Sequence, residues 1–274
     1  MGFNSTNKRL VSNNNQHIIL KTQDLSIGYK SKKKAAFVAS NINIELQKGE
    51  LIALVGANGI GKSTLLRTLT KVQPKLSGSI TINNILLEEH NAIGLAKSLS
   101  LVLTEQVASK NLTVFELVAL GRQPYTNWVG NLTTNDIAIV NNAITQTNIE
   151  VLKNKNCFEL SDGQLQKAMI ARALAQDTDL IILDEPTTHL DMYHKAYILK
   201  LLQKLVKETG KTILFSSHEI DLAIQLSDKM IVMTKGGVVS DSPRQHIAHG
   251  TFETLFPTDL ITFNKDTGSF RVKK

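Results

Sequence analysis

The sequence has a single cysteine, Cys157, and no hydrophobic run long enough to cross a membrane. A lone cysteine excludes a disulfide within the chain, fits a reducing compartment and is expected to be a small packing residue. A membrane-spanning helix needs about 18 apolar residues in a row, whereas runs such as LIALV and LIIL have the length of buried strands. We therefore expect a globular protein without disulfides or membrane helices.

The N-terminal residues lack the apolar core of a secretory signal. They are rich in Asn and Ser, so residues 1–17 are predicted to form a polar, disordered extension ahead of one domain over 18–274. The formal net charge of +7 is compatible with nucleic acid or anionic lipid as a partner. We interpret so modest an excess as a solvated surface, and we expect no nucleic-acid partner.

Strand-like and helix-like segments alternate along much of the chain, which is typical of parallel βαβ units. Short β-like segments fill residues 18–55, and the apolar run in DLIILDEP predicts a fully buried strand. Between about 107 and 176 only helix patterns occur, including capping-box spacing from Thr113 to Glu116. The sequence therefore predicts an α/β fold whose mainly parallel sheet is interrupted by an inserted helical subdomain.

The segment GANGIGKST, residues 56–64, follows the strand-like LIALV and precedes a helix pattern. It fits G-x-x-x-x-G-K-[ST] in the strand–loop–helix context that this phosphate-binding motif requires. Its glycines permit backbone angles that a side chain forbids, so several N–H groups can point inward around an anion. Lys62 adds a positive charge for the β- and γ-phosphates, Ser63 is placed to ligate Mg²⁺, and Thr64 to bind the α-phosphate. The loop residues expected to bind the nucleotide are Gly56, Asn58, Gly59, Gly61, Lys62, Ser63 and Thr64.

The segment LIILDEP supplies two acids at the end of a predicted strand. Asp184 can face the Mg²⁺ held by Ser63. Glu185 points elsewhere, which makes it the candidate base that orients and deprotonates an attacking water. Two solvated acids at a strand end are the alternative, and the nearby phosphate loop favours catalysis. The two motifs together predict ATP hydrolysis with Mg²⁺.

The segment LSDGQ, residues 160–164, opens a helix pattern that runs to about Ala175. Ser161 is the expected N-cap, and Gly163 would let a phosphate approach the backbone. The helix dipole adds about half a positive charge at this end. These features predict a second anion site, and an ordinary capped helix is the alternative.

These motifs, together with Gln106 in LTEQ, the segment THLD and His218 in SSH, occur in an order that resembles the ATP-binding subunits of ABC transporters. The resemblance covers nearly the whole chain. It implies a P-loop NTPase core, a small antiparallel β subdomain and the inserted helical subdomain. It also implies a head-to-tail dimer, in which Ser161, Gly163 and Gln164 of one copy face the γ-phosphate bound by the other copy.

The resemblance assigns roles to further single residues. Tyr29 would stack on adenine, with a half-buried strand tyrosine as the alternative. Gln106 would reach Mg²⁺ and the attacking water, unless it is a surface loop residue. Asp191 would bond across the dimer, and it is also expected to cap the following helix. His218 would contact the γ-phosphate and support Glu185. The expected catalytic residues are Glu185, His218, Gln106 and Lys62, and the expected Mg²⁺ ligands are Ser63, Gln106 and Asp184.

Two departures from the commonest family pattern are Asp162, in place of glycine, and His189, in place of alanine. With VALGRQPYT at 118–126 they resemble the importers for ferric siderophores, haem and cobalamin. This resemblance implies integral-membrane permease subunits, an extracytoplasmic substrate-binding protein and a peripheral location at the cytoplasmic face of the membrane. Asp162 adds an acid near a phosphate site.

The candidate docking groove for a permease helix consists of the helix expected at 113–121 and the segment QPYTNWVG that follows it at 123–130. Phe115, Tyr125 and Trp128 could anchor such a helix. For Phe115 we prefer packing inside the helical subdomain.

Other functions remain open from the sequence. An ABC ATPase of an exporter or another importer, and a soluble nucleic-acid-handling ABC ATPase, both fit the motifs. The single phosphate loop and the lack of a coiled-coil insertion weigh against the nucleic-acid alternative. A P-loop kinase would leave LSDGQ unexplained.

Two further pairs have the three-residue spacing of metal ligands on a helix, namely His246 with His249 and Asp191 with His194. No third ligand occurs at a comparable spacing, so we expect surface residues and no metal site there.

Overall fold

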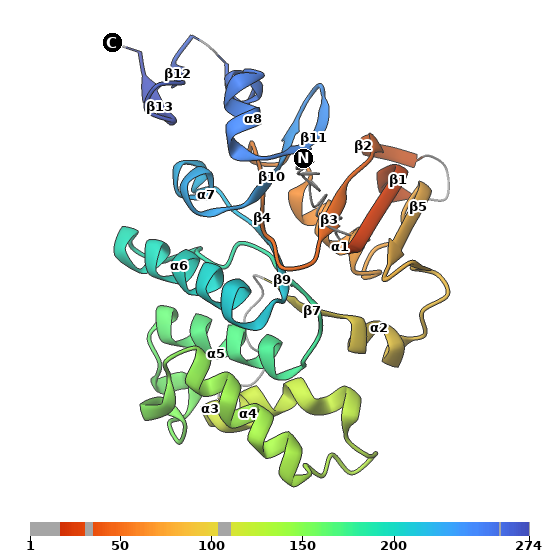
Figure 1. Cartoon of the computed structure of the whole chain (residues 1–274), viewed down its shortest axis with the longest axis vertical. Coiled ribbons are helices and arrows are strands. Elements are labelled where there is room, and N and C mark those ends of the chain that lie inside the picture. The colour runs from red at the N-terminus through yellow and green to blue at the C-terminus, as the bar shows by residue number, and fades with distance from the viewer. Residues whose placement is uncertain (1–16, 31–34, 104–110, 258, 274) are drawn as a thin grey trace, which may run out of the picture.

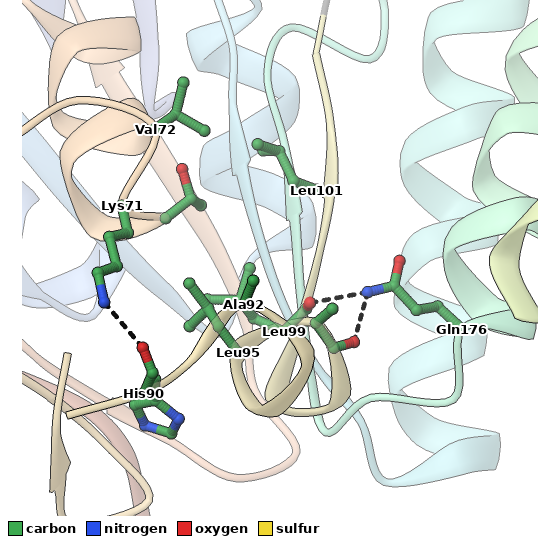
Figure 2. Close-up of a pocket in the computed structure, with 10 residues that line it drawn as sticks. Lys71, Val72, His90, Ala92, Leu95, Leu99, Leu101 and Gln176 are labelled. Atoms are coloured by element: carbon green, nitrogen blue, oxygen red, sulfur yellow. Dashed lines mark hydrogen bonds between the residues drawn. The ribbon is translucent and has the colours of Figure 1, made fainter. Parts of the chain in front are cut away.

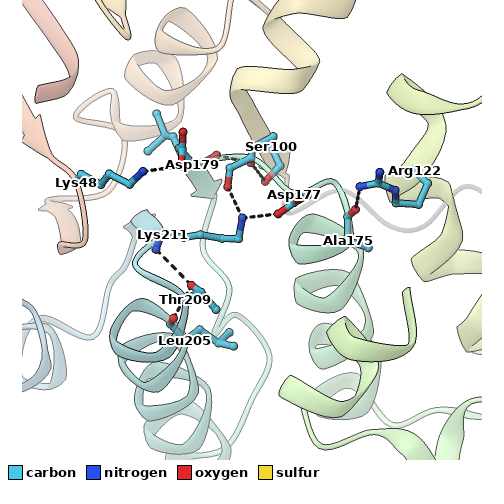
Figure 3. Close-up of polar contacts among 11 residues, drawn as sticks. Lys48, Ser100, Arg122, Ala175, Asp177, Asp179, Leu205, Thr209 and Lys211 are labelled. Carbon is cyan, nitrogen blue, oxygen red and sulfur yellow. Dashed lines mark hydrogen bonds and ion pairs between the residues drawn. The ribbon is translucent and has the colours of Figure 1, made fainter. Parts of the chain in front are cut away.

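The computed structural model describes residues 17–30, 35–103, 111–257 and 259–273. A six-stranded sheet forms its centre, in the order β11-β10-β4-β9-β8-β7 (Figure 1). All of these strands are parallel to their neighbours except β11, which pairs antiparallel with β10. The predicted, mainly parallel α/β fold is thus present. The strands are β4 (Leu51–Gly56), β7 (Leu99–Val102), β8 (Leu180–Leu183), β9 (Thr212–Ser216), β10 (Lys229–Thr234) and β11 (Gly237–Asp241).

The central strand β4 is buried along its whole length. Successive side chains of a strand point to opposite faces of the sheet. Leu51, Ala53 and Val55 therefore enter the core on one face, and Ile52 and Leu54 enter the core on the other. Because helices or a second sheet cover both faces, the strand is a continuous apolar run, as parallel strands usually are.

A second, antiparallel sheet lies beside the central one and was expected from the resemblance (Figure 1). Its order is β2-β1-β5-β6, with β3 pairing to β1. Its apolar side chains share a core with α1 (Lys62–Leu69) and with one face of the central sheet. This sheet and α1 therefore form one packed layer next to the phosphate loop. The strands are β1 (Ile18–Lys30), β2 (Ala35–Ile42), β3 (Glu45–Gln47), β5 (Ser77–Ile82) and β6 (Ile85–Leu86).

The described residues between 111 and 176 form a helical lobe, seen at the bottom of Figure 1. Thr113 caps the first helix in a capping box with Glu116, as the sequence predicts. Cys157 is buried and packs in the core of this lobe, which is the packing role expected of it. The elements are α3 (Val114–Ala119), η1 (Leu120–Tyr125), α4 (Thr134–Gln146), η2 (Glu150–Leu152), η3 (Cys157–Glu159) and α5 (Asp162–Ala175).

The remaining helices connect the strands. Asp191 caps α6 (Met192–Thr209), as predicted, and the helix ends at Gly210 in the left-handed region. The helix α2 before β7 and all elements after β11 had no sequence prediction. In the part of the chain described above, no helix is both long and apolar enough to cross a bilayer. The other elements are α2 (Ala92–Ser98), α7 (Ile220–Leu226), α8 (Pro243–Ala248), η4 (Thr251–Thr254), β12 (Ile261–Asn264) and β13 (Ser269–Val272).

The expectation that His246 lies at the surface is wrong. Its side chain is fully buried, and its Nε2 lies 3.0 Å from the carbonyl oxygen of Met230. The ring packs beside Phe252, with 5.6 Å between the ring centroids. His249 is exposed, as expected. Within the described ranges no cluster of three or more His, Cys, Asp or Glu side chains could hold a metal ion.

Candidate nucleotide-binding site

The phosphate loop joins the end of β4 to the start of α1, which is the predicted context. Gly59 has φ 74° and Gly61 has φ 114°, in the left-handed region that glycine adopts at little cost. A Cβ atom on Gly61 would also lie 2.2 Å from Cγ1 of Val38. Asn58, which directly precedes Gly59, is exposed. The backbone shape of the loop therefore depends on these two glycines.

Gly56 is needed for a different reason from the one expected. It is absent from the residues with positive φ, so backbone freedom does not explain it. A Cβ atom at this position would lie 2.6 Å from the carbonyl oxygen of Met233 on the neighbouring strand β10. Close packing between β4 and β10 therefore requires the glycine.

Lys62 lies inside the loop, with its side chain almost fully buried. Its Nζ donates to the carbonyl oxygen of Gly56 at 3.0 Å and to that of Ala57 at 3.4 Å. Burial lowers the pKa of Lys62, and the nearby carboxylates of Glu185 and Asp184 act in the opposite direction. The lysine thus lies between the loop backbone and both acids of the second motif.

Ser63 and Asp184 come together as predicted, although they are far apart in sequence. The hydroxyl of Ser63 donates to Oδ1 of Asp184 at 3.2 Å, and Asp184 is buried at the end of β8. One hydroxyl and one carboxylate oxygen facing each other are the hard oxygen donors that Mg²⁺ prefers. The donor set therefore fits a magnesium ion. Gln106, the third expected ligand, lies outside the described residues.

Ser216, which the sequence did not single out, joins the two acids. Its Oγ donates to Oδ1 of Asp184 at 2.7 Å and accepts a bond from the backbone N–H of Glu185 at 2.8 Å. Ser216 is fully buried at the end of β9, the neighbour of β8. The carboxyl ends of adjacent parallel strands meet at one edge of a sheet, and this was the available signal for Ser216.

Glu185 turns away from Asp184 and toward His218. Its backbone has φ 50°, an uncommon left-handed conformation for a residue with a side chain. Its Oε1 lies 2.6 Å from Nε2 of His218, and its Oε2 accepts a bond from the hydroxyl of Thr188 at 3.1 Å. A carboxylate held by two partners is fixed in direction, as a general base must be.

Tyr29 lies beside the phosphate loop. Its hydroxyl is 3.1 Å from Oγ1 of Thr64, and its side chain is 58% exposed. Tyr29 lies on β1 (Ile18–Lys30), so the alternative of a partly buried strand tyrosine also fits its position, and stacking on adenine stays a prediction. An exposed ring next to the loop has a face available for a base.

The LSDGQ segment forms the amino end of α5. Ser161 is the N-cap, and its Oγ accepts a bond from the N–H of Gln164 at 3.4 Å. Gln164 Oε1 accepts in turn from the N–H of Ser161 at 3.1 Å, which completes a capping box. Figure 1 shows α5 in the helical lobe, apart from α1 and the phosphate loop. Within one chain, therefore, the two helix ends that are predicted to bind anions belong to different parts of the fold.

Asp191 uses both carboxylate oxygens within its own chain. Oδ1 accepts from the backbone N–H of His194 and Oδ2 faces Nδ1 of the same residue, each at 2.8 Å. These bonds from His194 lower the pKa of Asp191. The predicted capping role is confirmed, whereas a bond across a dimer stays a prediction.

Comparison with known proteins decides the family. A family model described as ABC transporter matches residues 39–188. The chain belongs to the ABC transporter family. An uncharacterized ABC transporter ATP-binding protein of Methanocaldococcus jannaschii is 39% identical over 93% of this chain and 87% of its own length. The achromobactin transport ATP-binding protein of Dickeya dadantii is 35% identical, with 87% of each chain covered. The iron(3+)-hydroxamate import ATP-binding protein of Bacillus subtilis is 36% identical, with 81% of each covered.

A solved structure of an ATP-binding cassette dimer, in a post-hydrolysis state with ADP and Pi, has the same fold as this ABC protein. The TM-score is 0.70 at 26% identity, and the match covers 82% of this chain and 99% of that one. The predicted fold class and the predicted ATPase activity are thereby confirmed. The chain is an ATP-binding, ATP-hydrolysing ABC subunit.

Proposed function

We propose that this ABC subunit drives an importer for an iron chelate of the siderophore type, within the group that also imports haem and cobalamin. The relatives named for achromobactin transport and for iron(3+)-hydroxamate import support this substrate class, since they match over most of the chain. Asp162, His189 and the segment at 118–126, which resemble the same group, also support it. The observation that carries the proposal is this shared likeness to siderophore importers over most of the chain.

The proposed working unit is a head-to-tail dimer of two copies. The phosphate loop of one copy, with Lys62 and the N–H groups around Gly59 and Gly61, binds the phosphates of ATP. The partner copy presents the amino end of its α5, where Ser161, Gly163 and Gln164 face the γ-phosphate. This arrangement agrees with the position of α5 in a separate lobe of each chain (Figure 1). Two such composite sites form when the dimer closes.

Ser63, Asp184 and Gln106 would hold Mg²⁺, which neutralises developing charge on the phosphates when it is bound. Glu185 accepts a proton from the attacking water, and His218, 2.6 Å from it, holds the carboxylate in position. Ser216 keeps the two acids in fixed directions through its bonds to both. Tyr29 stacks on the adenine ring.

Closing and opening of the dimer would move integral-membrane permease subunits, which receive the chelate from an extracytoplasmic substrate-binding protein. The ATPase would then lie peripherally at the cytoplasmic face of the membrane. Trp128 is 97% exposed, so it is available for a permease helix. Tyr125 is 36% exposed, and its ring also packs against Arg122, whose Cζ lies 4.0 Å from the ring centroid. Phe115 packs against the core of the helical lobe instead, as preferred from the sequence. We place this helical subdomain at about 107–176.

Affinity purification of the chain from membranes tests this function. We expect a polytopic permease to co-purify, and expression of both proteins with a binding protein should support ATP-dependent uptake of a ⁵⁵Fe-labelled hydroxamate chelate. The Glu185→Gln variant, purified alike, serves as the control that assembles without driving uptake. Nuclease-sensitive association with ribosomes or DNA, without a permease, would contradict the proposal. Assembly with a permease that moves no iron chelate, haem or cobalamin would contradict the substrate class alone.

A further inference from the structure

The imidazole of His194 contacts both segments that the proposed dimer would present to its partner. His194 lies in the first turn of α6, and its Nδ1 is 2.8 Å from Oδ2 of Asp191. The other edge of the ring covers Gly163 of α5, since a Cβ atom on Gly163 would lie 3.3 Å from Cδ2 of His194. One side chain therefore joins the N-cap of α6 to the amino end of α5.

The two helices keep this register one turn further on. Nζ of Lys167 on α5 lies 4.1 Å from the ring centroid of Tyr197 on α6. Lys167 follows Gly163 by four residues, and Tyr197 follows His194 by three, so each pair lies on one helix face. The contact at His194 is thus part of an aligned packing of two helix ends.

Gly163 is also explained by this contact. The glycine is buried, and the atoms nearest to an added Cβ belong to His194 and Leu190 of the same chain. A Cβ at 3.3 Å from the ring is tighter than most packed contacts, so a side chain here would displace the imidazole. The small residue lets the ring pack directly against the α5 backbone.

We propose that His194 is a positioning residue for ATP hydrolysis, which fixes the phosphate-facing end of α5 relative to Asp191. The inference rests on the proposed head-to-tail dimer, because Ser161 and Asp191 both face the partner copy there. His194 acts through two separate contacts, a hydrogen bond to Asp191 and ring packing on Gly163. Its side chain is half exposed, so it supports these segments from the rim of the site.

The two contacts can be removed one at a time. His194→Phe keeps a ring over Gly163 and removes the bond to Asp191, His194→Asn keeps a donor and removes the ring, and His194→Ala removes both. His249→Ala is the matched control, since His249 is an exposed histidine at the end of another helix. Each variant is assayed for kcat and KM of ATP hydrolysis, with a thermal melt to verify folding.

We expect His194→Ala to lower kcat by about tenfold with KM for ATP within about twofold, because misplaced groups cost turnover while the phosphate loop is untouched. His194→Phe and His194→Asn should each restore part of the loss. A purely structural histidine would lower the melting temperature without this split and without partial rescue. Wild-type kcat in His194→Ala, or a raised KM with unchanged kcat, would overturn the inference.

A second measurement separates this inference from the dimer itself. In the Glu185→Gln background, which should hold ATP without turnover, ATP-driven dimerisation is followed by light scattering. We expect the dimer dissociation constant to rise by about tenfold when His194→Ala is added. A background protein that never dimerises with ATP would overturn the dimer together with the inference. Equal dimerisation with and without His194→Ala would overturn the inference alone.

Discussion

Nε2 of His218 lies 2.6 Å from Oε1 of Glu185, the acid that directly follows Asp184. The Glu185 carboxylate is held from its other side by Thr188, so it points away from Asp184. Two adjacent acids are thereby given different neighbours, and this separation permits one to face a cation and the other to accept a proton.

Replacing Glu185 by Gln should lower ATP turnover by about 10²–10⁴-fold, the usual contribution of a positioned base, while ATP binding persists. An amide keeps the size of the side chain but cannot accept the proton from water. Phosphate release and calorimetric ATP binding measure the two effects. Glu253→Gln, in an exposed ion pair with Lys265, is a control expected to behave as wild type. Undiminished phosphate release in Glu185→Gln would remove this residue from the mechanism.

Ser216→Ala should impair both turnover and folding, because one buried hydroxyl bonds to both acids. We expect about tenfold slower turnover from loss of positioning. The free energy of unfolding should fall by about 1–3 kcal/mol, since the N–H of Glu185 loses its partner. Urea unfolding and phosphate release test this. Ser98→Ala, which removes a half-buried helix hydroxyl bonded to Gly94, should change stability by less than about 1 kcal/mol. Equal effects of the two variants would mean that Ser216 has no special role.

The buried pair of Arg122 and Asp136 should stabilise the helical lobe. Nε of Arg122 lies 2.9 Å from Oδ1 of Asp136, and both side chains are about 5% exposed. The substitution Arg122→Ala should lower the free energy of unfolding by about 3–5 kcal/mol at neutral pH, because the charge of Asp136 stays buried without its partner. Lys204 forms an exposed ion pair with Glu208, so Lys204→Ala is the matched control. It should lower the free energy of unfolding by less than about 1 kcal/mol.

Asp136 should also make the fold sensitive to acid. Bonds from the hydroxyl and the N–H of Thr133, with help from Arg122, lower the pKa of Asp136 from 3.8 to about 2. Because the folded pKa is the lower one, the stabilisation is present above about pH 4 and is lost as the pH falls toward about 2. Urea unfolding at pH 5, 3 and 2 should show a smaller loss in Asp136→Asn than in the wild type. Parallel losses in both proteins would exclude Asp136 as the source.

His246 should lower the free energy of unfolding as the pH falls, in a higher pH range than Asp136 does. Burial has the largest effect on the pKa of His246 and lowers it. The bond to Met230 and the charge of Asp241 act in the opposite direction. Below about pH 6.5 the unfolded chain therefore takes up a proton that the folded chain resists, and the free energy of unfolding decreases. His246→Gln places an amide N–H near the position of Nε2, which faces Met230, but does not titrate, so its stability should depend less on pH between 6.5 and 5. His249→Gln, at an exposed site, should keep the wild-type slope. An identical slope in His246→Gln would contradict this assignment.

Local signals in the sequence predicted local structure well. The helix caps at Thr113, Ser161 and Asp191 were all predicted, because a capping side chain and the N–H that it accepts lie within four residues. The phosphate loop was predicted for the same reason, since its glycines determine its shape.

Features that depend on contacts between distant segments could not be predicted in this way. Ser216 becomes a site residue only because β9 pairs with β8, and Gly56 is required only because β10 lies beside β4. His246 is buried because α8 packs beside β10 and η4, and no sequence prediction covered α8 or η4. The contact between His194 and Gly163 likewise depends on how α6 packs on α5.

The most direct test of the shared composite site is a mixing experiment with two inactive variants. Lys62→Ala removes the lysine of the phosphate loop, and Ser161→Arg blocks the amino end of α5. If one site takes its loop from one copy and its α5 end from the other, a mixed dimer contains one intact site and one doubly defective site. The account predicts that mixing the two inactive proteins restores ATP hydrolysis. At an equal ratio about half of the dimers should be mixed, and each mixed dimer should carry one working site out of two. Persistent inactivity at every mixing ratio, in dimers proven to be mixed by two affinity tags, would contradict it.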